Sequence, residues 1–114
     1  IGEVLARGTG IGSSIVTGKI RICRTPEEAK KKIQPGDILV VRSTDKDYIP
    51  FIKKAGAIIA EEGGLTSHTA ITSLNLKIPA LVGVDGALEI LDDGSTATID
   101  LIRGLVYKGI ITVR

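Results

Sequence analysis

The run Gly-Gly-Leu-Thr-Ser-His at residues 63–68 combines residue types that suit phosphate chemistry. Gly63 and Gly64 allow the backbone to adopt positive φ and to approach a ligand closely. Thr66 or Ser67 supplies a hydroxyl that can cap a helix, whose first N–H groups have no partner within the helix. These N–H groups and the helix macrodipole attract anions. The spacing therefore predicts a phosphate or anion site formed by these four residues.

His68 adds a nucleophile to the same helix end. A neutral imidazole can attack a phosphorus centre, and the phosphoryl group would then face the donors of the helix end. Glu61 and Glu62 precede the glycines and are candidates to orient the imidazole. A lone histidine in a first helical turn is also common without any function, so the spacing alone leaves both interpretations open.

Two other acidic segments are better interpreted as turns than as metal ligands. Asp85-Gly86 and Asp92-Asp93-Gly94 lack the spaced oxygen ligands of a calcium loop. We therefore predict no metal site in this chain.

Alternating strands and helices are expected to position the loop that carries His68. Connections of two to six residues between them favour a mixed, mostly parallel central sheet flanked by helices. Apolar and β-branched runs predict strands at 15–23, 37–42, 57–60 and 78–84, and capping and periodicity predict helices at 25–33, 44–53 and 66–75.

The two ends of the chain have a different character. Residues 1–12 are glycine-rich and weakly patterned, which predicts a linker before a domain over 13–114. Near the C-terminus, residues 95–99 and 105–108 flank a turn and predict a smaller antiparallel hairpin element, and residues 110–113 are a candidate for one more strand. Gly18 is a candidate bulge in the first predicted strand.

The composition is typical of a globular domain. The 114 residues are 43% hydrophobic and 25% charged. With 15 basic and 13 acidic side chains, the net charge is small, and we predict neither a nucleic-acid nor a membrane partner. No apolar run approaches the ~20 residues that span a bilayer.

The single Cys23 excludes an internal disulfide and favours a cytoplasmic location. We expect Cys23 to be a small buried side chain. Because the chain begins with Ile1 rather than Met, we expect it to be a piece of a longer protein.

Residues 63–70, with Pro79 downstream, resemble the phosphohistidine signature of the phosphoenolpyruvate (PEP)-utilising enzymes, which include pyruvate phosphate dikinase, PEP synthase and enzyme I of the sugar phosphotransferase system. Residues 36–40 and 57–62 also resemble the mobile, or swivelling, domain of that family, so the resemblance covers about 13–109. It implies a β/β/α fold in which the histidine at the position of His68 accepts a phosphoryl group and the domain swings between two active sites. The threonine at the position of Thr66 is a regulatory phosphorylation site in some dikinases.

Leu74 departs from the carrier members of the family, which commonly have an arginine at this position. Within the family, the extra C-terminal domain of bacterial pyruvate kinases is similar in this respect, and residues 8–12, 43–45 and 78–84 also resemble that domain. This resemblance implies a parent enzyme of glycolysis that converts PEP and ADP to pyruvate and ATP. It further implies Mg²⁺ and K⁺ bound outside this chain, the remainder of the pyruvate kinase chain as a partner, and a cytoplasmic homotetramer.

Three functions follow from these observations. The first is an accessory structural or regulatory domain of pyruvate kinase with an anion pocket at His68, not catalytically active alone. The second is an active phosphohistidine carrier of the dikinase or PEP synthase type. The third is a binding module that holds a small anion such as phosphate or sulfate.

Overall fold

Short runs of aliphatic residues form eight strands in the computed structural model, which describes residues 2–112. Side chains branched at Cβ pack well on a pleated surface, and they dominate these runs. In chain order the strands are β1 (Val4–Arg7), β2 (Thr9–Ile11), β3 (Ile15–Ile22), β4 (Ile38–Val41), β5 (Ala57–Ala60), β6 (Ala80–Val82), β7 (Thr96–Asp100) and β8 (Leu105–Lys108).

The strands form one mixed sheet in the order β1-β8-β7-β3-β4-β5-β6-β2. Strands β3 to β6 are parallel neighbours, whereas β1, β8 and β7 extend the sheet antiparallel from β3, and β2 pairs antiparallel with β6. The predicted mixed sheet is therefore confirmed. Its antiparallel part is larger than the expected hairpin, because β1 and β2 also belong to it.

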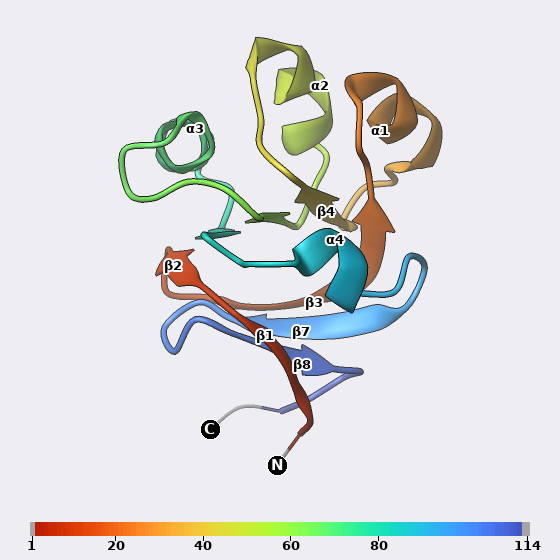
Figure 1. Ribbon diagram of the computed structural model, residues 1–114, viewed down its shortest axis with the longest axis vertical. Helices are drawn as coiled ribbons and strands as arrows, with labels where there is room; N and C mark the ends of the chain where they lie inside the picture. The colour runs from red at the N-terminus through yellow and green to blue at the C-terminus, as the bar shows by residue number, and fades with distance from the viewer. Residues whose placement is uncertain (1, 113–114) are drawn as a thin grey trace.

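Four helices complete the fold, and three of them cover one face of the parallel strands. Figure 1 shows α1, α2 and α3 side by side above β4, with β3, β7 and β8 on the opposite side. The result is the β/β/α layering that the resemblance implies. The helices are α1 (Pro26–Lys32), α2 (Ile49–Ile52), α3 (His68–Leu76) and α4 (Ala87–Ile90), and a 3-10 helix (Lys46–Tyr48) precedes α2.

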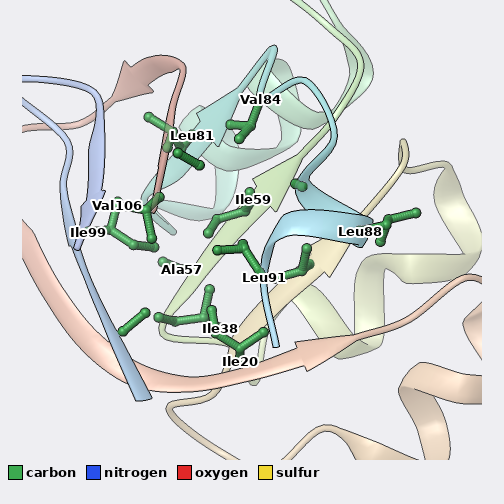
Figure 2. Close-up of a cluster of buried hydrophobic side chains, with 14 of the residues drawn as sticks. Ile20, Ile38, Ala57, Ile59, Leu81, Val84, Leu88, Leu91, Ile99 and Val106 are labelled. Atoms are coloured by element: carbon green, nitrogen blue, oxygen red, sulfur yellow. The ribbon is translucent and has the colours of Figure 1, made fainter. Parts of the chain in front are cut away.

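Two hydrophobic clusters hold the layers together. One fills the space between the parallel strands and the antiparallel layer, where side chains such as Ile20, Ile59 and Ile99 gather with Leu91, which follows α4 (Figure 2). The other lies between the parallel strands and helices α1 to α3. Strands β4 and β5 contribute to both clusters and are buried on both faces, as their continuous apolar runs predict. Each fully buried Ile, Leu or Val contributes about 1.5–3 kcal/mol.

The N-terminal stretch predicted as a linker is part of the sheet. Strands β1 and β2 occupy the two ends of the strand order, and Gly8 between them donates a hydrogen bond to the carbonyl oxygen of Gly104 (2.9 Å). The glycines indicate close packing here rather than flexibility. A Cβ atom on Gly10 would lie only 1.8 Å from the carbonyl oxygen of Leu101. This prediction was wrong because a glycine that allows close packing cannot be told from a flexible one in the sequence.

Two smaller predictions also differ from the structure, and one short helix was not predicted. Gly18 is not a bulge, since its register with β7 is unbroken, and a Cβ there would meet the Gly36 carbonyl oxygen at 2.7 Å. Helix α4 was not predicted, because four residues are too few for a periodic pattern. Residues 110–112 form no strand, and residue 113 of that predicted strand lies outside the described residues.

Burial of two weak acids predicts a loss of stability at alkaline pH. Burial, only partly offset by Lys32, raises the pKa of Cys23 from 9.0 to about 11, and burial raises the pKa of Tyr48 to about 12. Because the folded state keeps these protons more tightly than the unfolded state, the stabilisation is complete below about pH 9 and is lost as the pH rises toward 11. We expect the free energy of unfolding to fall by about 1–2 kcal/mol between about pH 8 and pH 10.5 through Cys23.

Urea unfolding of the wild type and of Cys23→Ala at both pH values tests this expectation. The variant should lose distinctly less stability over the interval, whatever its stability at pH 8. Equal losses in the two proteins would contradict it.

Candidate functional site

The loops that follow the parallel strands meet at one edge of the sheet. Residues 42–45 follow β4 and residues 61–67 follow β5, and parallel neighbours place their carboxyl ends side by side. Helix α3 begins at the end of the second loop. Thr44 and His68, which are 24 positions apart in the chain, are thereby brought into contact.

In the loop over residues 63–67, Gly63 uses the positive φ that both glycines allow, and Gly64 does not. Gly63 has φ +115°, and a Cβ atom there would lie 2.8 Å from Ser67 Oγ. Ser67 donates from its backbone N–H (3.1 Å) and from its hydroxyl (2.8 Å) to the carbonyl oxygen of Gly64. Of the two candidate capping hydroxyls, Ser67 is the N-cap, and its Oγ accepts from the N–H of Ala70 (3.2 Å). Thr66 is exposed in the preceding turn.

His68 is the first residue of α3, and both ring nitrogens have threonine neighbours. Its Nδ1 lies 3.0 Å from Thr44 Oγ1, whose other neighbour is Thr69 Oγ1 at 2.6 Å. Its Nε2 has a longer contact of 3.4 Å with Thr72 Oγ1. The imidazole is exposed, whereas Thr69 and Thr72 are buried. The hydroxyl of Thr44 therefore holds Nδ1 of an exposed imidazole, and Nε2 faces the hydroxyl of Thr72.

The start of α3 has free backbone donors next to this imidazole. Ser67 satisfies the N–H groups of Ala70 and Ile71 through its hydroxyl and carbonyl oxygens. Within residues 2–112, the N–H groups of His68 and Thr69 have no acceptor. Two peptide donors and one imidazole thus border the same helix end.

The two candidate orienting acids do not bind His68. Glu61 accepts a hydrogen bond from the N–H of Leu88 (2.8 Å) and so anchors α4, while Glu62 forms an ion pair with Arg42 (2.7 Å). Successive residues of a strand point to opposite faces of the sheet, so residues two positions apart share a face. Glu61 therefore points to the same face as Ile59, which is the face covered by α4. Thr44 holds the imidazole in place of the predicted carboxylates.

Sequence reasoning missed Thr44 as a contact of His68 and Arg42 as the partner of Glu62. Both follow β4, and the loop after β4 borders the loop after β5 because the two strands are parallel and adjacent. The hydrogen bond and negative charge of Glu62 raise the pKa of Arg42. Such residues are identified by their position directly after a neighbouring parallel strand. They can be found only once the order of the strands in the sheet is known.

Leu74 lies on a different side of α3 from the contacts of His68. It is 63% exposed and borders a shallow apolar groove with Ile11, Lys77 and Pro79 next to β2. Leu74, where the resemblance leads us to expect an arginine in carrier members, thus faces the groove.

The predicted turns at Asp85 and Asp92–Asp93 are turns in the structure. Asp93 accepts a hydrogen bond from the N–H of Ile22 (2.8 Å) and pairs with Lys32 (3.3 Å). Over residues 2–112, no group of three or more His, Cys, Asp or Glu side chains is arranged to hold a metal ion. None of the helices over the same residues is long and apolar enough to cross a membrane.

Thr44→Val tests the hydroxyl network around His68. Removing the hydroxyl breaks the contacts to His68 and Thr69, so we expect the free energy of unfolding to fall by about 1 kcal/mol. The ¹⁵N ring signals of His68 should also shift toward those of a histidine that exchanges freely between tautomers. The control is Thr66→Val, where an exposed hydroxyl is lost. Equal stability of the two variants would contradict a role for Thr44.

Comparisons with known proteins relate this geometry to a family. The sequence profile described as PEP-utilising enzyme, mobile domain, matches residues 33–104. Over 109 residues the chain is 50% identical to a pyruvate kinase of Lactobacillus delbrueckii subsp. bulgaricus, covering 96% of this chain and 18% of that protein. It is 44% identical over 110 residues to a PEP synthase of Aeropyrum pernix, covering 96% of this chain and 13% of that protein. The chain thus spans less than a fifth of the length of these relatives.

A solved structure supports the fold alone. Aconitase X of Thermococcus kodakaraensis superposes with a TM-score of 0.68 at 21% identity, covering 92% of this chain and 98% of that chain. The family assignment rests instead on the matched profile, which includes the whole His68 loop, and on the identity to pyruvate kinases and PEP synthases. The chain belongs to the family of PEP-utilising enzyme mobile domains.

Proposed function

We propose that this chain is an accessory domain of a pyruvate kinase, with a pocket at His68 for a phosphate-sized anion. The observation that carries the proposal is the helix start, where two N–H groups without an acceptor among residues 2–112 lie beside an imidazole held by Thr44. Backbone donors and the positive end of a helix dipole attract anions. The 50% identity to a pyruvate kinase supports the choice of parent enzyme.

In this proposal the chemistry takes place elsewhere in a longer protein. The parent enzyme would convert PEP and ADP to pyruvate and ATP in the cytoplasm, with Mg²⁺ and K⁺ in its catalytic part. The partner of this domain would be the remainder of the chain within a homotetramer. The domain itself would have a structural or regulatory role through anion binding at Gly63, Gly64, Thr66 and Ser67.

Titration of the ¹⁵N-labelled 114-residue chain with inorganic phosphate tests the anion pocket. We expect saturable amide shifts concentrated on residues 63–70, with the largest at His68 and Thr69. Sodium chloride at matched ionic strength is the control, because general screening would move charged residues across the whole surface. Shifts that do not saturate, or that are equal in phosphate and chloride, would contradict the pocket.

A second candidate is the phosphohistidine carrier, which the exposed imidazole of His68 favours. If Nδ1–H donates to Thr44, the lone pair of Nε2 can attack phosphorus once the 3.4 Å contact with the Thr72 hydroxyl is released. A new N–P bond would form as the P–O bond of a phosphoryl donor such as PEP breaks, and the oxygen would leave with the electron pair. The 44% identity to a PEP synthase also supports this candidate.

Labelled PEP distinguishes the two candidates in the full-length enzyme that carries the domain. For an accessory domain we expect no acid-labile, base-stable label during turnover. Label that appears in the wild type and is absent from His68→Ala would instead establish the carrier. Pyruvate formation by both proteins serves as the control for an intact catalytic part.

A further inference from the structure

A hollow of about 290 Å³ lies outside the carboxyl ends of β3 and β4. Because these two strands are parallel neighbours, the loop that follows β3 lies next to the loop that follows β4. In sheets of this kind, ligands commonly bind in a crevice outside the carboxyl ends of the strands. A volume near the lower limit of known ligand pockets suits a small ligand. The lining residues are Arg24, Thr25, Pro26, Glu27, Arg42, Ser43, Asp45 and Tyr48.

Tyr48 extends its hydroxyl into this hollow. The residue is only 5% exposed, and its ring packs in the hydrophobic cluster under the helices. Among residues 2–112 the hydroxyl has no hydrogen-bond partner, yet every fully buried side-chain N or O atom there has one. The hydroxyl is therefore the part of Tyr48 that reaches the hollow. Tyrosine hydroxyls usually have a partner when the ring is buried, so this one is available to a ligand.

Two carboxylates of the lining lie near the same hydroxyl. Burial raises the pKa of Tyr48 to about 12, and the negative charges of Asp45 and Glu27 contribute to the shift. Asp45 Oδ1 accepts a hydrogen bond from the N–H of Asp47 (2.9 Å), which holds this carboxylate at the start of the 3-10 helix. The hollow thus offers a phenolic oxygen and two carboxylates as acceptors for a cationic group.

Two arginines supply the opposite charge at the rim of the hollow. Arg24 and Arg42 are both exposed. Arg42 donates from Nε to Glu62 (2.7 Å), while its terminal nitrogens have no acceptor in the described part of the chain. Over the same residues, the guanidinium of Arg24 has no acceptor either. A guanidinium binds a carboxylate through two parallel hydrogen bonds, so the rim suits a carboxylate.

We infer that this hollow binds a free α-amino acid in its zwitterionic form. The ammonium group donates to Tyr48, Asp45 and Glu27, and the α-carboxylate accepts from Arg24 and Arg42. A ligand of one sign would meet two like charges in the lining, whereas a zwitterion meets an opposite charge at each end. The inference goes beyond the proposed anion pocket and does not depend on it, because the two sites share no residue.

Titration of the ¹⁵N-labelled 114-residue chain with each of the twenty standard L-amino acids tests the site. We expect at least one of them to cause saturable amide shifts in residues 24–27 and 42–48. Its N-acetyl derivative lacks the positive charge and its methyl ester lacks the negative charge, so each should bind about tenfold more weakly or worse. A derivative that binds as tightly as the amino acid would overturn the zwitterionic ligand. No saturable shift with any amino acid, or shifts confined to residues 63–70, would overturn the site and leave the anion pocket untouched.

Tyr48→Phe removes only the hydroxyl and keeps the buried ring, so we expect it to weaken binding about tenfold. Arg24→Gln, a change of an exposed side chain, should weaken binding by a similar factor. The matched control is Tyr107→Phe, which removes the hydroxyl of a tyrosine that is 7% exposed on β8, outside the hollow. Its Kd should stay within about twofold of the wild type. Equal Kd values for Tyr48→Phe and Tyr107→Phe would overturn the role of Tyr48, and an unchanged Kd in Arg24→Gln would overturn the carboxylate end.

Discussion

Gly63→Ala is expected to destabilise the domain by about 2–3 kcal/mol and to weaken phosphate binding about tenfold. Gly63 has φ +115°, a conformation that side chains with a Cβ rarely adopt. The added Cβ would also lie 2.8 Å from Ser67 Oγ and 2.9 Å from Ser67 Cβ. Relief of this clash displaces the N-cap of α3, and loss of a cap costs about 1 kcal/mol by itself. The same displacement would misplace the N–H donors of His68 and Thr69.

Gly64→Ala is the matched control for that prediction. Gly64 is not in the positive-φ region, and a Cβ atom there has no neighbour within 4 Å. Its stability should stay within about 0.5 kcal/mol of the wild type. Urea unfolding gives the stability of both variants, and phosphate titration gives their affinity. Equal behaviour of the two variants would show that Gly63 has no special role.

Gly10→Ala is expected to cost about 3 kcal/mol or more, a large part of the total stability of a small domain. Its Cβ atom would lie 1.8 Å from the oxygen and 2.7 Å from the carbonyl carbon of Leu101. Both are backbone atoms, so no side-chain rotation can relieve the contact. Strand β2 would have to move away from the turn after β7 and weaken its pairing with β6.

Thr9→Ala, one residue earlier in the same strand, is the control for Gly10→Ala. Thr9 is exposed, and its replacement should change the free energy of unfolding by less than about 0.5 kcal/mol. Thermal and urea unfolding of the two variants measure the difference. A Gly10→Ala protein as stable as Thr9→Ala would contradict the packing of β2 against Leu101.

Local chemistry explains which features could be predicted from the sequence. The cap of α1 by Thr25, with Pro26 in its first turn, and the cap of α3 by Ser67 depend on residues a few positions apart. Strands β4 and β5 are continuous apolar runs, which identify buried strands without knowledge of their neighbours. The His68 loop was recognisable for the same reason, since all of its parts lie within six consecutive residues.

The identity of the partners at the site depended on the order of the strands. Thr44 contacts His68, and Arg42 pairs with Glu62, because β4 and β5 are parallel neighbours. Glu61 binds the start of α4 instead of the imidazole, because alternate residues leaving β5 point to opposite faces. No local pattern contains this information.

The sequence by itself determined the family, the helix start that carries His68 and the buried parallel strands, because each depends on neighbouring residues. Only the tertiary structure decided which glycines are sterically restricted. Gly63 is restricted by Ser67 and Gly10 by Leu101, whereas Gly64 meets no neighbour, although the sequence shows the same residue at all three positions. The physical reason is that steric restriction depends on the backbone path and on which atoms become neighbours in the fold, within one turn for Gly63 and Ser67 and between distant segments for Gly10 and Leu101.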